Sequence, residues 1–240
     1  VLTSHATTWR GTGANGFPNF KKQTKRCRPY SDMKALNEAW QLLLKQKSVT
    51  VDAAKLDLIW TGRELLGNLF GYEKAEFDSA YVAADTVKMH EKAYIMRALL
   101  TDLDMLNAQH PFCTVDKWID QAREFGQTPE VKDYYEMNAR RIITTWGGDL
   151  NDYAVRNYSG LIANYHAKRW EIYIDEAFRS VRTGTPFRDK ERIKATNEFQ
   201  LSFADKHGEQ FPKYQGIELL SFSRALASKY ATELQSWLTK

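Results

Sequence analysis

The stretch that decides the fold is residues 73–107, which read EKAEFDSAYVAADTVKMHEKAYIMRALLTDLDMLN. Apolar side chains recur there at intervals of three and four, as they do on the buried face of an α-helix. Neither proline nor glycine interrupts the pattern, which ends before His110-Pro111 because proline cannot continue a helix. We therefore expect one long helix, straight or bent, from Glu73 to about Asn107.

Helical spacing extends outward from this stretch in both directions. Towards the N-terminus, Ser31-Asp32 offers a helix cap, and Gly71 follows a second periodic segment. Towards the C-terminus, Thr128-Pro129-Glu130 is a helix start signal and Gly184-Thr185-Pro186 is an end signal. Strand signals are nearly absent, so the sequence predicts a single all-α domain over residues 31–240. Its helices, about eight in number, are expected at 31–44, 56–70, 73–107, 115–125, 128–145, 149–181, 189–206 and 217–239.

Residues 1–30 form an N-terminal arm of different character, rich in glycine and basic residues, which we expect to be a loop or linker. The formal net charge of the whole chain is +4, and residues 21–28, KKQTKRCR, hold five basic residues and no acidic one. The basic character is therefore local. It suits either a solvated arm or a patch that binds anions or nucleic acid.

The composition is that of an ordinary globular protein, with 43% hydrophobic and 27% charged residues in 240. No apolar run approaches the length of a membrane helix, so we expect no membrane partner. The chain starts at Val1 without a leader-like segment, and we expect a trimmed N-terminus. Cys27 and Cys113 permit at most one disulfide, and whether they pair stays open.

Neither a cofactor nor a metal is predicted. The glycines of residues 11–16 fit the letters of a dinucleotide-binding fingerprint, but Pro18 follows at once and no strand–helix alternation surrounds them. The five histidines show no Glu-x-x-His or His-x-x-x-His spacing, which disfavours di-iron and zinc sites.

The most specific pattern lies in residues 133–187, with DYYEMNAR at 133–140, TTWG at 144–147, LNDYA at 150–154 and SGLIANY at 159–165. It closely resembles the C-terminal helical domain of glycoside hydrolase family 89, the α-N-acetylglucosaminidases. Residues 38–44, EAWQLLL, resemble the first helix of that domain, and the resemblance covers residues 28–240.

This resemblance implies the C-terminal part of an exo-acting, retaining hydrolase that removes terminal α-linked N-acetylglucosamine from glycans. In the family, the two catalytic glutamates lie on an upstream (β/α)₈ barrel. We therefore expect no catalytic residue in this chain, which alone should be inactive, and expect residues 1–30 to be the junction to that barrel. The resemblance also implies a role in carbohydrate metabolism and an extracytoplasmic location, periplasmic or secreted in a bacterium and lysosomal in an animal.

The family motif places Trp146, Leu150 and Tyr153 at the substrate pocket. A tryptophan face packs well against a pyranose, and a tyrosine hydroxyl can hydrogen-bond a sugar hydroxyl. Each of these residues also suits an ordinary core position. Trp146-Gly147-Gly148-Asp149 departs from the family's longer Trp-Gly-Pro loop, which makes the placement of the other two residues less direct.

Two interpretations from another class stay open: a free-standing helical module that binds polyanions through the basic arm, and a glycan-binding module without a catalytic partner. The leading hypothesis names the upstream barrel and a terminal N-acetylglucosamine as partners and expects no nucleic acid. The natural glycan and the oligomeric state are not predicted.

Overall fold

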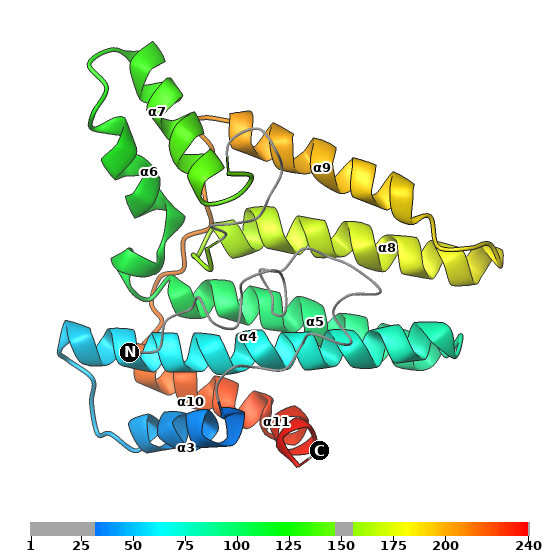
Figure 1. Ribbon diagram of the computed structural model, residues 1–240. Coiled ribbons are helices and arrows are strands. Elements are labelled where there is room, and N and C mark those ends of the chain that lie inside the picture. Colours follow the sequence, from blue (N-terminus) through cyan, green and yellow to red (C-terminus); the bar gives the residue numbers. More distant parts are fainter. Residues whose placement is uncertain (1–31, 147–155, 240) are drawn as a thin grey trace.

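The computed structural model describes residues 32–146 and 156–239, and within these ranges it is almost entirely helical (Figure 1). Extended backbone pairs in this part of the chain only at an isolated bridge between Thr114 and Ser159. The described ranges contain nine α-helices, which confirms the predicted all-α class. None of these helices is long and apolar enough to cross a membrane.

In chain order, the helices are α3 (Met33–Leu44), α4 (Asp52–Val82), α5 (Thr86–Asn107), α6 (Val115–Arg123), α7 (Pro129–Ile142), α8 (Ala167–Thr183), α9 (Asp189–Asp205), α10 (Leu219–Lys229) and α11 (Ala231–Leu238). A 3₁₀ turn, Pro111–Cys113, precedes α6, and a π-helical turn, Ile162–His166, leads into α8.

Residues 73–107, predicted to form one helix, belong to two helices separated by a turn. Helix α4 continues through Gly71 to Val82, the chain reverses, and α5 returns along α4 (Figure 1). Ala84 turns the chain with φ of +54°, and the Asp85 carboxylate caps α5 by accepting from the Lys88 N–H at 3.0 Å. The prediction of one helix was wrong because alanine, the strongest helix former, carries no stop signal.

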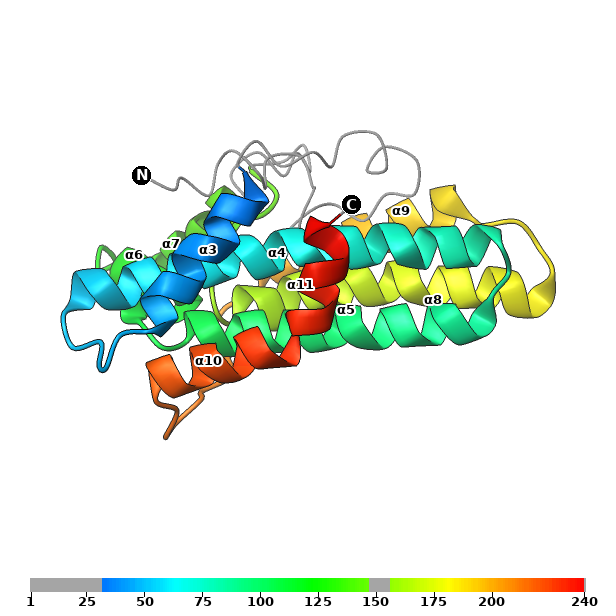
Figure 2. The same ribbon diagram turned by 90° about the horizontal axis from the view of Figure 1, so that it is seen from below.

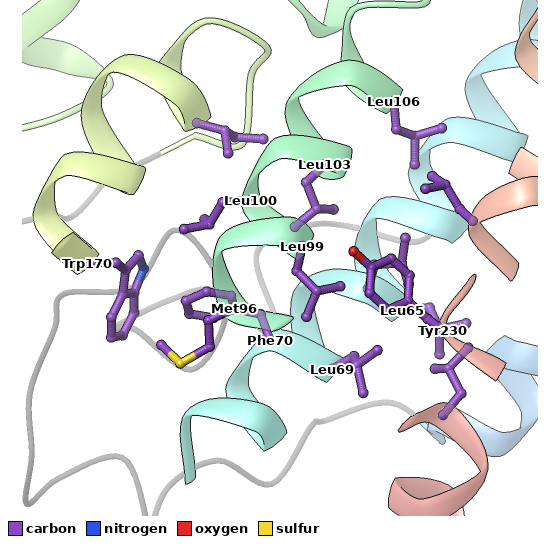
Figure 3. Packing of buried hydrophobic residues seen from close by; sticks show 14 of the residues in the cluster. Leu65, Leu69, Phe70, Met96, Leu99, Leu100, Leu103, Leu106, Trp170 and Tyr230 are labelled. Atoms are coloured by element: carbon purple, nitrogen blue, oxygen red, sulfur yellow. The ribbon is translucent and has the colours of Figure 1, made fainter. Parts of the chain in front are cut away.

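The core lies where α4 and α5 pack against α8 and the C-terminal helices. Phe70 of α4 meets Trp170 of α8 with ring centroids 4.9 Å apart. On the opposite side, Trp40 of α3 packs so closely on Gly62 that an added Cβ would lie 2.9 Å from its ring. Figure 3 shows the centre of this core, formed by Leu65, Leu69, Phe70, Met96, Leu99, Leu100, Leu103, Leu106, Trp170 and Tyr230.

The predicted C-terminal helix at 217–239 is also two helices. α10 ends and α11 begins at Tyr230, whose buried hydroxyl donates to the Asp102 carboxylate at 2.6 Å. This hydrogen bond fixes the bend against α5, a long-range contact that local spacing does not reveal.

The predicted helix at 149–181 begins later than expected. Residues 156–160 are not helical, and regular α8 starts at Ala167 after the π-helical turn. Its predicted end is confirmed, because Gly184 adopts the left-handed conformation that closes the helix. Figure 2 shows α8 lying beside α5 and α4 along the long axis of the molecule.

Helices α6 and α7 form a hairpin at one end of the bundle (Figure 1). Thr114 and Thr128 cap the two helices through their hydroxyl groups, as their positions in the sequence predicted. The hairpin turn is tight at Gly126, where an added Cβ would lie 2.6 Å from the backbone nitrogen of Lys132. The C-terminal end of α7 leads directly to Trp146.

Candidate functional site

Trp146 is the one predicted pocket residue that lies within the described ranges. It follows α7 with 42% of its surface exposed, and its backbone N–H donates to the Arg141 carbonyl at 2.6 Å. Its backbone has φ of +49°, a left-handed conformation that is unfavourable for a bulky residue. The chain thus bears a conformational cost here and presents a large aromatic ring at the surface, which is typical of functional positions.

Leu150 and Tyr153 lie outside the described residues, so their place at the pocket stays a prediction. What the structure does show is how the chain is held on either side of 147–155. Thr144 and Thr145 are fully buried before this segment, as are Ser159 and Leu161 after it. Ile143 and Leu161 belong to one small hydrophobic cluster, so the two ends of the segment rest on the same core.

Asp104 of α5 anchors the C-terminal end of that segment. Its buried carboxylate accepts from the N–H groups of Gly160 at 2.7 Å and Ala163 at 3.1 Å, and from the hydroxyls of Ser159 and Tyr214 at 3.3 and 2.9 Å. Burial raises the pKa of the Asp104 carboxyl, and these hydrogen bonds oppose part of the rise. One side chain therefore ties the backbone of residues 159–163 to the central helix pair.

Neighbouring contacts reinforce this anchor. Ser159 donates its N–H to the Cys113 carbonyl at 2.8 Å and accepts from the Val115 N–H at 3.0 Å. The Nε2 of His166 lies 2.9 Å from the Arg156 carbonyl, and burial, followed by the Arg169 charge, lowers the pKa of His166 to about 3. His166 is therefore neutral at physiological pH and can donate to that carbonyl.

Arg140 anchors the other end by fixing the last turn of α7. Its fully buried guanidinium donates to Glu136 at 2.9 and 3.0 Å and to Glu209 at 3.0 Å. It also stacks between the rings of Phe203 and Phe211. The ion pairs and the stacking together hold α7 against α9 and against the residues that follow α9. Trp146 therefore follows a helix end that is fixed by several side-chain contacts.

Two further polar side chains are buried close to the residues that follow position 155. Arg63 of α4 is 8% exposed and interacts electrostatically with Cys113 and Tyr158, and its Nε has no hydrogen-bond partner among the described residues. Burial lowers the pKa of this guanidinium. Asn157 is 6% exposed, and its Oδ1 likewise has no partner in the part of the chain that the structure describes.

Sequence reasoning missed Asp104 and Arg140. Both are charged residues within amphipathic helices, where spacing alone gives no sign that they are buried. The only available signal was position: Asp104 lies between Leu103 and Leu106 in the most apolar part of α5, and an acid there requires partners.

Asn37-Glu38 and Asn197-Glu198 match a dipeptide found around glycosidase acids, but their carboxylates do not meet. Glu38 lies exposed on α3 and Glu198 lies exposed on α9, and these helices are on opposite sides of the bundle (Figure 1). In the described ranges, moreover, no group of three or more His, Cys, Asp or Glu side chains is arranged to hold a metal ion.

Comparison with known families decides the identity of the domain. The family model described as "Alpha-N-acetylglucosaminidase (NAGLU) C-terminal domain" matches residues 5–229. The chain belongs to this family. The match includes most of the N-terminal arm, whereas the resemblance noted from the sequence began at residue 28.

Relatives of this α-N-acetylglucosaminidase C-terminal domain are much longer proteins. Human α-N-acetylglucosaminidase is 30% identical over 199 residues, which are 80% of this chain and 26% of the human protein. Two structures of a family 89 glycoside hydrolase from Clostridium perfringens share 21% identity and the same fold. One is bound to 2-acetamido-1,2-dideoxynojirimycin (TM-score 0.74) and the other to its substrate GlcNAc-α-1,4-galactose (TM-score 0.76). Each match covers 90% of this chain and 26% of the bacterial one.

Proposed function

We propose that this chain serves as the C-terminal domain of an exo-acting, retaining glycoside hydrolase that removes terminal α-linked N-acetylglucosamine, and that it forms one wall of the substrate pocket. The family match over residues 5–229 carries the proposal. The names of the relatives support the sugar, since one is an α-N-acetylglucosaminidase and another was solved with an N-acetylglucosamine disaccharide.

In this proposal, Trp146 contacts the sugar. Its exposed ring offers an apolar face to the C–H groups of a pyranose, and its strained backbone and the fixed helix end before it support a role beyond packing. Tyr153 and Leu150 complete the pocket wall, with the Tyr153 hydroxyl as a hydrogen-bonding group. The support for these two residues is the family motif.

The catalytic acids come from an upstream (β/α)₈ domain of the same polypeptide. Retention requires two carboxylates about 5 Å apart, one to attack the anomeric carbon and one to protonate the leaving oxygen. The exposed, separated positions of Glu38 and Glu198 do not suit this geometry. The chain spans about a quarter of its relatives' length, which leaves ample sequence for a catalytic domain.

Trp146→Ala in the full-length enzyme tests the role of the ring. We expect kcat/KM on an aryl α-N-acetylglucosaminide to fall by about 10- to 100-fold through loss of ring–sugar contact. Trp146→Gly makes the test sharper, because glycine tolerates the positive φ: this variant should be at least as stable as wild type while losing the same activity.

Tyr94→Ala is the matched control. Tyr94 is an aromatic residue on α5 that is 71% exposed, and its removal should leave kcat/KM unchanged. If Trp146→Ala also leaves kcat/KM unchanged, Trp146 is not part of the pocket.

We also propose an extracytoplasmic location, secreted or periplasmic in a bacterium and lysosomal in an animal, and a role in carbohydrate metabolism. The support is the glycan substrate class of the family. Fractionation of the source cells, with enzyme activity assayed in each fraction, tests this.

A further inference from the structure

The hairpin of α6 and α7 carries an unusual share of the exposed apolar surface. Thirteen large hydrophobic side chains are exposed in the described residues, and six of them lie within residues 115–146. Isolated exposed hydrophobics are normal, but a concentration of them marks an interaction surface. We refer to these six as the α6–α7 patch: Phe125, Val131, Tyr134, Tyr135, Ile142 and Trp146.

A groove of about 650 Å³ runs between the two helices within this patch. Its floor is closed by Trp118, whose indole N–H donates to the Ala139 carbonyl at 2.9 Å, so the ring offers only carbon atoms to an occupant. Phe125 and Tyr135, with centroids 6.1 Å apart, stand at its edge. Ala122, Ala139 and Ile142 complete its apolar lining, and Gln121, Glu124 and Asn138 add polar groups. The groove is therefore formed in the chain alone and is mainly apolar.

Two arginines beside the patch are already paired within the chain. Arg123 pairs with Asp133 and Glu136 at 2.7 and 2.6 Å, and Arg141 pairs with Asp205 at 2.6 Å. A partner therefore gains little by supplying carboxylates to these two arginines. The surface that fits is apolar over the groove and polar at its rim, as in the interfaces between domains of one chain.

The length of the relatives and the position of Trp146 indicate what this partner is. The family is that of a C-terminal domain and the chain spans 26% of its relatives, so most of such an enzyme precedes it. Trp146 belongs to the patch and is proposed to reach the sugar. The domain that holds the catalytic acids must then approach the C-terminal end of α7, whose last residue, Ile142, lines the groove.

We propose that the α6–α7 patch is the docking surface for the upstream catalytic domain of the same polypeptide, with an apolar side chain of that domain in the groove. This inference rests on the proposed function. It adds which face of the helical domain is covered and the chemistry of the surface that covers it.

Hydroxyl-radical labelling of the full-length enzyme tests the proposal. Phe125, Tyr134 and Tyr135 are 73%, 58% and 38% exposed in this chain, and Tyr94 is 71% exposed on α5. We expect the three patch residues to be labelled several-fold less than Tyr94. Labelling of Phe125 and Tyr134 as strong as that of Tyr94 overturns the proposal. So does protection that disappears on dilution, because a second copy would then be the occupant.

A disruptive variant provides the second measurement. Tyr135→Glu places a charge at the groove edge and should raise labelling of Phe125 and Tyr134 several-fold and lower kcat/KM. Tyr94→Glu is its control and should change neither. Unaltered patch labelling in a folded Tyr135→Glu enzyme also overturns the proposal. Activity of the unmodified enzyme, assayed in the same preparation, separates the docking proposal from the proposed function. If the enzyme is active and the patch is labelled, only the docking surface is refuted. If the enzyme is inactive, the proposed function is refuted.

Discussion

At the scale of single residues, Asp104 shows how much depends on one buried carboxylate. It accepts four hydrogen bonds, two of them from the backbone N–H groups of Gly160 and Ala163. Spacing in the sequence could not identify it, since an acid within a helix is exposed far more often than buried. Trp146 was predicted from the family motif alone, because nothing in helical periodicity separates a surface tryptophan from a core one.

Two substitutions of Asp104 should separate the contribution of its hydrogen bonds to stability from the contribution of its charge. Asp104→Leu leaves buried donors unsatisfied and should lower the free energy of unfolding by about 2–5 kcal/mol. Asp104→Asn keeps an acceptor for the two backbone N–H groups and should cost about 1 kcal/mol or less. Urea unfolding of the chain, followed by tryptophan fluorescence, measures both. Equal losses in the two variants would contradict this role for the hydrogen bonds.

A comparison of the wild type with Asp104→Asn also gives a prediction of how stability depends on pH. The pKa of Asp104 is raised in the folded state, so the folded state holds this proton more tightly than the unfolded state. Stability of the wild type relative to Asp104→Asn should therefore fall as the pH rises from about 3 through the folded-state pKa and level off above it. A wild-type protein that gains stability over Asp104→Asn across this range would show that the pKa is lowered instead.

At the scale of elements, the sequence identified where most helices begin and end but missed two turns. Capping side chains act locally, so Asp32, Thr114, Thr128 and Gly184 could be recognised from their neighbours alone. The turn at Ala84 was missed because alanine is a strong helix former, and the turn at Tyr230 depends on a hydrogen bond to Asp102, which is distant in sequence.

Ala84 offers a direct test of the first turn. Its left-handed backbone is unfavourable for alanine and natural for glycine, so Ala84→Gly should raise the free energy of unfolding by about 0.5–1 kcal/mol. Ala83→Gly is the matched control, because Ala83 has φ of −79° and gains nothing from glycine; it should be neutral or destabilising. Chemical denaturation resolves the difference. The proposed strain at this turn is wrong if both variants lose stability alike.

At the scale of the whole molecule, our proposal assigns a wall of the pocket to this chain and the catalytic carboxylates to another domain. In the described residues, Glu38 and Glu198 are exposed and lie on separate helices. We expect the 240-residue chain to show no turnover of an aryl α-N-acetylglucosaminide under conditions in which the full-length enzyme is active. A continuous chromogenic assay, with both proteins at equal molar concentration, makes the comparison. Robust turnover by this chain would refute the division of labour between the two domains.

The anchoring of both ends of residues 147–155 on one small core has an evolutionary consequence. Because Asp104 and Arg140 fix the chain on either side, insertions and exchanges between these anchors leave the helices undisturbed. Variation in this short segment can therefore accumulate without loss of folding. Members of the family can therefore differ in sequence between these two anchors while they keep the same helical scaffold.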